Sequence, residues 1–368
     1  MTDEAVLTMK ASAETSETSA TYRRVVATTR GGPDVLELIE EPVPEPALGE
    51  VRLRVLAAGV GFPDILMREG TYPGGPAWPF TPGCDVVGEV DVLGPGVTGV
   101  QRGDRVAALT YYGKVCGSYA DVVCLPSDYL IPVPDGVDPA AAVCLVLNYT
   151  TAFQMLKRTT RVLAGERLLV HGAAGGVGTA ALELGRLYGL EMYGTASARD
   201  ADVVRGLGAT PIDYRSEDFA ERLRALGGVD VALDGIGGTV SVRSYRALRR
   251  GGRLVLFGHH STLLDGRRSA RKIAEYYANA AATLLASVLP DGRRVTTYQI
   301  AKLRDRHPEW FGADLRILLT LLAQGHLAPI VAERLSLEEA RRAHELLGRG
   351  GIAGKIVIVP TTAGPATG

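Results

Sequence analysis

The stretch RLLVHGAAGGVGTAALELGRLYG, Arg167 to Gly189, constrains the fold more than any other feature of the chain. An apolar run of strand type breaks into glycines and resumes as an amphipathic helical segment. The loop is a variant of the G-x-G-x-x-G fingerprint, with Ala173, Gly175 and Gly178 at its three fixed positions. The missing Cβ at Gly175 lets a pyrophosphate approach the backbone, and Gly178 lets the helix pack closely on the strand. A tight strand-to-helix turn without a ligand would use the same glycines, so the context decides between the two.

The surrounding pattern supports a dinucleotide-binding domain. After the glycine loop, strand-like runs alternate with helical segments for over a hundred residues, which favours right-handed βαβ units and a doubly wound parallel sheet. The preceding segment consists of short β runs separated by Gly and Pro, which is typical of a partly open barrel. We therefore predict an α/β protein divided as follows: a disordered tail (1–21), the first part of a β-rich catalytic domain (22–142), the Rossmann domain (143–304), a return to the catalytic domain (305–360) and a second tail (361–368).

Charge and cysteine content exclude several function classes. The net charge of −1 provides no electrostatic footprint for nucleic acid or for an anionic membrane. The four cysteines form no CxxC pair, which indicates reduced thiols. The N-terminus lacks the apolar core of a signal peptide, and we find no apolar run approaching the ~18 residues of a membrane span. We expect a soluble cytoplasmic protein whose partner is a small molecule.

The end of the second Rossmann strand, GTASARD, bears on which dinucleotide is bound. An NAD site places an acid there to bind the ribose 2′-hydroxyl. Here small residues precede a cation, and Ser197, Arg199 and Tyr214 would supply donors and charge for a 2′-phosphate. Asp200 could instead be the ribose acid, but it lies beyond the expected strand end, where it would cap the next helix. We predict NADPH.

Several phrases resemble the medium-chain dehydrogenase/reductase superfamily: AAGVGFPDIL, TPGCDVVGEV, HGAAGGVG and AGKIVIVP. The motifs LNYTTAFQML, GTASA and LLAQGHLAP are similar to sequences of its zinc-free quinone oxidoreductase branch, including the subgroup of synaptic vesicle membrane protein homologues. The resemblance covers about residues 22–360. It implies that the β-rich domain is GroES-like and that the last Rossmann strand, in VTTYQI, pairs with its two-fold mate in a homodimer. Relatives also often carry an Asn where Ile352 stands.

The resemblance also locates where zinc-dependent relatives hold their metal. They carry Cys in the AAGVGFPD turn and His-Glu at GCD, whereas this chain has Gly61 and Cys84–Asp85. The region of the third ligand offers Cys144 and Asn148. Zinc needs at least three protein ligands, so we predict no metal site.

Without a metal, reduction of a quinone or an α,β-unsaturated carbonyl fits better than alcohol oxidation, because the developing charge is delocalised over an oxygen held by hydrogen-bond donors. We predict Tyr72 and Tyr149 as catalytic candidates, although each could simply pack. The expected cofactor-binding residues are Asn148, Thr151, Ala174, Gly175, Gly176, Val177, Gly178, Ser197, Arg199, Tyr214, Phe257, Gly258, Tyr298 and Ile300. Open alternatives are a pathway-specific enoyl reductase, an NADPH-binding module with little turnover, and a zinc alcohol dehydrogenase.

Four other features have mainly structural interpretations. We interpret Asp64 as a helix cap or ion-pair partner and not as a base, and His171 as a hydrogen-bonded strand-end histidine and not as an acid-base group. We expect His259–His260 to lie in a surface loop, with a position at the edge of the cofactor as the alternative. The run RRSARK, 267–272, is expected to be a solvated face, with an anionic carrier as the alternative.

Overall fold

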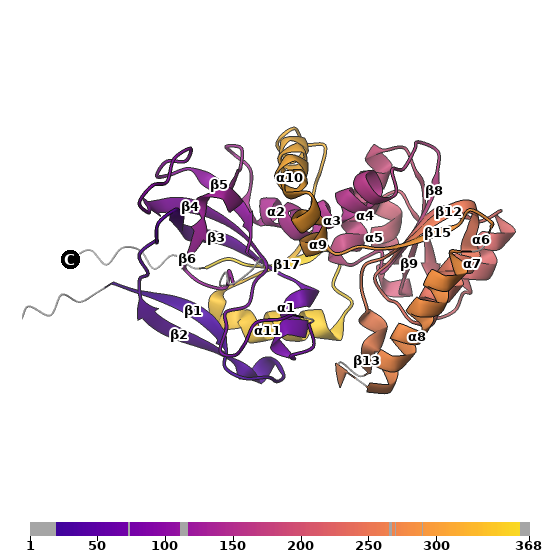
Figure 1. Ribbon diagram of the computed structural model, residues 1–368, viewed down its shortest axis with the longest axis horizontal. Coiled ribbons are helices and arrows are strands. Elements are labelled where there is room, and N and C mark those ends of the chain that lie inside the picture. Colours follow the sequence, from indigo (N-terminus) through magenta and orange to yellow (C-terminus); the bar gives the residue numbers. More distant parts are fainter. Residues whose placement is uncertain are drawn as a thin grey trace, which may run out of the picture.

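The computed structural model describes residues 20–72, 74–110, 117–264, 267–268, 270–288 and 290–360. Two domains lie side by side (Figure 1), and helix α10 lies above their junction. The tails 1–19 and 361–368 and Cys116 lie outside the described residues. Cys84 and Cys144 are buried free thiols.

The first domain is built on a sheet that is antiparallel except for the parallel pair β16–β17. Its longest strand, β3 (Glu50–Val60), pairs with β4 along its length, with β6 at Glu50–Arg54 and with β17 at Ala58–Val60. The strand order is β16-β17-β3-β4-β5-β7, and β1 and β2 form a separate two-stranded sheet. Alternate residues of β3 are buried, and they form one side of a core of valines, leucines and alanines. This arrangement is the expected GroES-like, partly open barrel.

The elements of this domain are β1 (Thr21–Ala27), η1 (Pro33–Val35), β2 (Leu36–Pro42), α1 (Phe62–Arg68), β4 (Asp85–Leu93), β5 (Arg105–Leu109), β6 (Val122–Pro126), η2 (Ser127–Tyr129), β7 (Ile131–Pro132), β16 (Val331–Leu335), η7 (Leu337–Glu339), α11 (Ala340–Arg349) and β17 (Lys355–Ile358).

The second domain contains a six-stranded sheet in the order β10-β9-β8-β11-β12-β15, in which every pairing is parallel. The order reverses between β8 and β11, which is the point where open α/β sheets bind ligands. Helices α6, α7 and α8 cover one face, while α4 and α5 lie on the side of the first domain (Figure 1). The predicted Rossmann fold is confirmed.

Its elements are β8 (Arg167–His171), α4 (Gly176–Leu187), β9 (Glu191–Ala196), η5 (Ala198–Asp200), α5 (Ala201–Gly206), β10 (Thr210–Asp213), α6 (Phe219–Ala225), β11 (Val229–Asp234), α7 (Thr239–Ala247), β12 (Leu248–Leu256), η6 (His260–Thr262), β13 (Leu263–Leu264), β14 (Arg267–Arg268), α8 (Ala270–Ala286) and β15 (Arg294–Thr297). Helices α9 (Ile300–Arg306) and α10 (Pro308–Ala323) follow.

A continuous helical run connects the domains through α2 (Pro139–Cys144), η3 (Leu145–Tyr149), α3 (Thr150–Phe153) and η4 (Gln154–Thr159). Asp138 caps it by accepting from the amides of Ala140 and Ala141, as its sequence position predicts. In length and composition Pro139–Thr159 could span a membrane, which the search for apolar runs in the sequence missed. However, 89% of its most apolar window is buried inside the protein, as expected for a core helix.

The chain returns to the first domain next to the glycine loop. The amide of Gly354 donates to the carbonyl of Ala174 at 2.9 Å, and Gly175 and Gly354 form a parallel bridge. Strand β17 therefore begins at the loop that was predicted to bind pyrophosphate. This connection places the last strand of one domain against the ligand loop of the other.

Candidate active site

A cleft of about 1220 Å³ lies between the domains, at the carboxyl ends of the Rossmann strands. Residues from the ends of β8 and β9 and from the loops after β11 and β12 line one wall, and residues from α1 and the segment before β17 line the other. All of the predicted cofactor-binding residues line this cleft, as does Tyr72. The structure thus brings together residues that are separated by more than two hundred positions in the sequence.

The glycine loop lines the cleft on the side of the Rossmann domain. Gly175 is extended (φ −71°, ψ 173°) and precedes the first turn of α4. A Cβ at Gly178 would lie 2.3 Å from the carbonyl oxygen of Gly172 and 2.7 Å from that of Ala173, so only glycine allows the helix to begin this close to the strand. A Cβ at Gly176 would lie 2.2 Å from Nδ2 of Asn148. Gly176, Val177 and Gly178, the first residues of α4, line the cleft, and the amides of a first helical turn have no acceptor within the helix, which suits an anionic diphosphate.

We call Ser197, Arg199 and Tyr214 the adenosine rim, because they line the end of the cleft beyond β9. The side chain of Arg199 is 67% exposed and Tyr214 is 54% exposed. The Ser197 hydroxyl donates to Asp200 Oδ2 at 2.6 Å, and Arg199 Nε lies 3.4 Å from Asp200 Oδ1. Asp200 makes no side-chain capping bond to α5, so the expected cap is not formed. Its carboxylate instead contacts Ser197 and Arg199 of the rim.

Sequence reasoning missed three further cations in this part of the cleft. Arg215, Arg243 and Arg349 also line it, from the loop after β10, from α7 and from the end of α11. Arg243 is paired with Asp218 at 3.0 Å and packs on the ring of Phe219. Arg215 directly follows the predicted Tyr214 and could have been found from that position. Arg349 could not, because it comes from the other domain.

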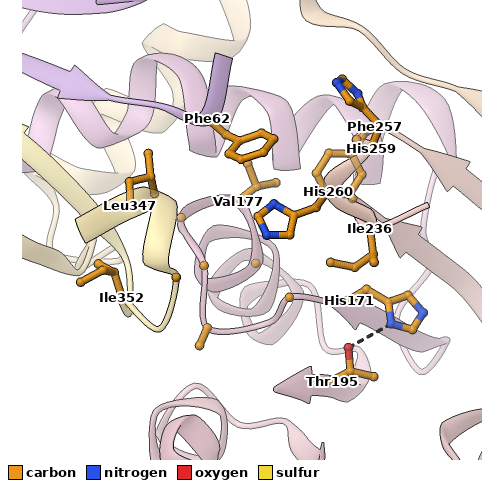
Figure 2. A pocket seen from close by; sticks show the side chains of 18 of the residues that line it. Phe62, His171, Val177, Thr195, Ile236, Phe257, His259, His260, Leu347 and Ile352 are labelled. Carbon is orange, nitrogen blue, oxygen red and sulfur yellow. Dashed lines mark hydrogen bonds between the residues drawn. The ribbon is translucent and has the colours of Figure 1, made fainter. Parts of the chain in front are cut away.

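The opposite end of the cleft is apolar and aromatic (Figure 2). Phe62 from α1 and His260 from the loop after β12 approach each other across the cleft with ring centroids 4.8 Å apart. His259 also lines the cleft, and its ring lies 5.9 Å from that of Tyr276 on α8. His260 is exposed and His259 is half-buried, so the pair lies in a surface loop, and both side chains also line the cleft, as the alternative position at the edge of the cofactor would require.

The polar side chains at this end are almost completely buried. Tyr298 is 6% exposed, and its hydroxyl donates to Oε1 of Gln154 at 2.8 Å. Thr151 and Asn148 are similarly buried, and both line the cleft. Ile352 lines the cleft as well, so an apolar group stands where relatives often carry an amide. His171, beneath the glycine loop, is bonded to Thr195 and Ser244 at 2.9 and 2.8 Å, as its structural interpretation predicts (Figure 2).

The two catalytic candidates lie in different places. Tyr72 is half-buried in the wall of the cleft. Tyr149 is directed away from the cleft and donates to Oε2 of Glu183 on α4, and burial raises its pKa. Tyr149 follows Asn148 in a helical run, so a rotation of about 100° per residue turns its side chain out of the cleft-facing direction. The structure gives no geometric support for the catalytic role expected of Tyr149.

We call Asp64, Asp85 and Lys355 the interdomain floor, because these buried ionisable groups lie beneath the apolar end of the cleft. Lys355 Nζ lies 2.9 Å from Asp85 Oδ2, and both side chains are at most 2% exposed. Asp64 accepts from the amides of Gly61 and Gly83 at 2.7 and 3.1 Å, which confirms its capping role, and from the Cys84 thiol at 3.1 Å. Burial raises the pKa of Asp64 to about 6.

This floor occupies the region where zinc-dependent relatives hold their metal. A Cβ at Gly59 would lie 2.1 Å from Cε of Lys355, so the lysine passes directly over the backbone of β3. The internal ammonium thus neutralises the Asp85 carboxylate. In the described part of the chain, no group of three His, Cys, Asp or Glu side chains is arranged to hold a metal ion.

Comparisons with known proteins agree with this geometry. A zinc-binding dehydrogenase family model matches residues 207–358, and an alcohol dehydrogenase GroES-like domain model matches residues 47–135. The synaptic vesicle membrane protein VAT-1 homolog of Rattus norvegicus is 32% identical, over 92% of this chain and 84% of its own.

Two solved structures have the same architecture. The quinone oxidoreductase of Pseudomonas syringae pv. Tomato DC3000 has a TM-score of 0.80 and 30% identity, over 92% of this chain and all of its own. The Escherichia coli quinone oxidoreductase complexed with NADPH has a TM-score of 0.78 and 28% identity, over 93% of this chain and all of its own. The chain therefore belongs to the zinc-free quinone oxidoreductase branch of the medium-chain dehydrogenase/reductase superfamily.

Proposed function

We propose that the protein is an NADPH-dependent reductase of quinones or α,β-unsaturated carbonyl compounds. The observation that carries this proposal is the cleft itself, which joins a glycine loop and a cationic rim to an apolar, aromatic-lined end. The NADPH bound by the Escherichia coli relative supports the choice of cofactor. When bound, the dinucleotide supplies the hydride.

The residues present fit such a cofactor. The close packing allowed by Gly178 leaves the α4 amides open to a diphosphate, and Arg199 and Tyr214 are exposed and able to meet a 2′-phosphate. The apolar end excludes water, which strengthens any hydrogen bond to the oxygen of a substrate. Phe62 and Phe257 provide flat apolar surfaces for a conjugated ring or enone.

We assign Tyr72 as the hydrogen-bond donor to the substrate oxygen, or as the proton source at the α-carbon. It lines the cleft on the side of the catalytic domain, beside Phe62 and Leu66. We expect Tyr72→Phe to lower kcat by about 10²-fold, the lower end of the range for general acid catalysis. NADPH affinity should stay unchanged, because the ring is retained. A variant with wild-type kcat would exclude Tyr72 from the chemistry.

The function is tested by following NADPH oxidation at 340 nm with a panel of benzoquinones, naphthoquinones, enones and acyl thioesters. We expect saturable turnover with quinones or enones that survives exhaustive chelation, and no oxidation of simple alcohols. Loss of activity with a chelator and recovery with added zinc would favour a zinc alcohol dehydrogenase. Tight NADPH binding without turnover on any acceptor would favour a binding module, and a preference for thioesters would favour a pathway-specific enoyl reductase.

We also propose a homodimer formed through β15. This strand is the end strand of the Rossmann sheet and is mostly exposed, and Leu285 and Val288, near the end of α8, are 72% and 81% exposed. An uncovered strand edge next to apolar side chains favours pairing with a second copy. Light scattering at micromolar concentration should give twice the chain mass, and a monomer would contradict the proposal.

A further inference from the structure

Helix α8 has an outer side that is apolar and open to solvent. The helix lies beside α7 on one face of the Rossmann sheet (Figure 1). Its exposed apolar residues fall within about 160° of the helix circumference, at 100° per residue. We call them the α8 stripe: Ala274, Tyr277, Ala278, Ala281, Ala282, Leu284, Leu285 and Val288. Leu285 and Val288 are 72% and 81% exposed. A contiguous apolar patch of this kind marks an interaction surface.

The inner side of α8 is more polar than the outer side, which reverses the usual pattern of a surface helix. Lys272 donates to Glu275 Oε2 at 3.2 Å, and the side chain of Asn279 donates to the carbonyl of Glu275 at 2.8 Å. The hydroxyl of Thr283, which is 2% exposed, donates to the carbonyl of Asn279 at 2.6 Å. These polar groups are thus satisfied within the helix, whereas the apolar side chains face outward. The pattern indicates that a second surface covers the outer side.

The position of α8 favours a second copy of the chain as that surface. The helix contacts β15, so a two-fold axis that pairs β15 with its mate also brings α8 toward its own copy. Strand β15 has four residues, whereas a stable interface takes about 20–30 residues from each partner. The α8 stripe supplies further contact area next to the strand. It carries no charge, so two copies meet without like-charge repulsion, and its alanines let two helices approach closely.

The same helix also forms part of the cleft wall. Ile273 and Tyr276, on its inner side, line the cleft. The ring of Tyr276 lies over the loop after β11, where a Cβ at Gly237 would come within 2.4 Å of Cε2 of the tyrosine. A contact that holds α8 from outside therefore also holds this wall in place.

We propose that the α8 stripe is a self-association surface, covered by the α8 stripe of a second copy, and that this contact supports the cleft wall. The inference rests on the homodimer of the proposed function, to which it adds a helix pair and a link between assembly and cofactor binding. Such a link is reciprocal. If the dimer binds NADPH more tightly than the monomer does, NADPH strengthens the dimer by the same factor.

The surface is tested with Ala281→Glu, because Ala281 is exposed and lies at the centre of the stripe. Two copies of the variant bring like charges together, so it should be a monomer by light scattering at micromolar concentrations at which the wild-type protein is a dimer. The matched change Ala313→Glu, at an exposed position of α10, should leave the dimer intact. Both variants should keep the far-ultraviolet circular dichroism of the wild-type protein, which shows that they are folded.

Charge complementation identifies what covers the stripe. Ala281→Arg should also be a monomer by itself, whereas an equimolar mixture of Ala281→Glu and Ala281→Arg should dimerise, because opposite charges then meet across the two-fold axis. The monomeric variants should bind NADPH at least about 5-fold more weakly than the wild-type dimer in a fluorescence titration. No step of the test requires turnover, so its outcome is independent of the reductase activity.

Dimers of Ala281→Glu and Ala281→Arg that are as stable as the wild-type dimer overturn the inference and leave pairing through β15 intact, whereas a wild-type monomer overturns both. A mixture that stays monomeric overturns the contact between the two stripes. Wild-type protein that sediments with phosphatidylcholine vesicles, when Ala281→Glu does not, would assign the stripe to a bilayer instead. Monomeric variants with wild-type affinity for NADPH overturn the link to the cleft.

Discussion

The adenosine rim and the interdomain floor both carry charge, but they differ in what surrounds it. At the rim, Arg199 is 67% exposed and adjoins a single carboxylate. At the floor, Asp85 and Lys355 are almost completely buried and are paired with each other at 2.9 Å. An exposed charge costs little to maintain without a strong partner, so it remains available to a ligand. A buried charge must be neutralised internally, so it serves the structure.

The largest expected effect comes from removing one charge of the buried Asp85–Lys355 pair in the interdomain floor. Asp85→Asn leaves the Lys355 ammonium buried without its counter-charge, and we expect the free energy of unfolding to fall by about 3–5 kcal/mol. Urea unfolding measures the change. The double variant Asp85→Leu/Lys355→Met should recover most of the loss. Asp202→Asn, which breaks an exposed pair with Arg205, should produce no resolvable loss. Equal effects at the buried and exposed pairs would contradict the comparison.

A smaller effect is expected at the rim, on binding and not on stability. Arg199→Ala should weaken NADPH binding by about 1.5–3 kcal/mol, the value of a charge-assisted hydrogen bond, and should barely change NADH binding. Urea unfolding should be unaltered, because the side chain is mostly exposed. Titration of both cofactors measures the difference, with Arg205→Ala as a control on the adjacent helix. Equal losses for NADPH and NADH would show that Arg199 does not recognise the 2′-phosphate.

The smallest expected effect is the pH dependence of the free energy of unfolding, because two buried groups contribute to it with opposite signs. Burial raises the pKa of Asp64 to about 6, so between pH ~4 and 6 the folded state binds a proton that the unfolded state lacks, and stability rises as pH falls. Burial lowers the pKa of His344 to about 3, so in the same range only the unfolded state is protonated, and stability falls as pH falls.

Wild-type stability should therefore change little between pH 6 and 5 on account of these two groups. Of these two groups only His344 titrates in Asp64→Asn, so between pH 6 and 5 its free energy of unfolding should fall by about 1 kcal/mol more than that of the wild-type protein. Urea unfolding across this range gives the slope, which does not depend on the absolute loss caused by the substitution. Parallel slopes in the two proteins would rule out a titrating Asp64.

Local sequence identified the parts of the site that depend on short-range geometry. The glycine loop, the rim residues and the Asp64 cap each follow from residues a few positions apart, and the structure places all of them as expected apart from Asp200. The orientation of Tyr149, in contrast, could not be inferred from its neighbours in the sequence. Its neighbours Asn148 and Thr151 face the cleft, but the helical period directs Tyr149 toward Glu183. Without knowing which face of the helix meets the cleft, the residues of NYTTAF could not be distinguished.

By itself, the sequence determined the two domain types, the glycine loop and the cationic character of the rim, because turn geometry, hydrophobic period and residue chemistry are local properties. Only the tertiary structure decided that Lys355 neutralises Asp85, that Arg349 reaches the cleft, that Phe62 meets His260, and that Gln154 donates to Asp314. These contacts join residues from 160 to more than 250 positions apart along the chain. Their partners are set by how strands, helices and domains pack in three dimensions, and the side chains concerned carry no local pattern that would reveal the pairing.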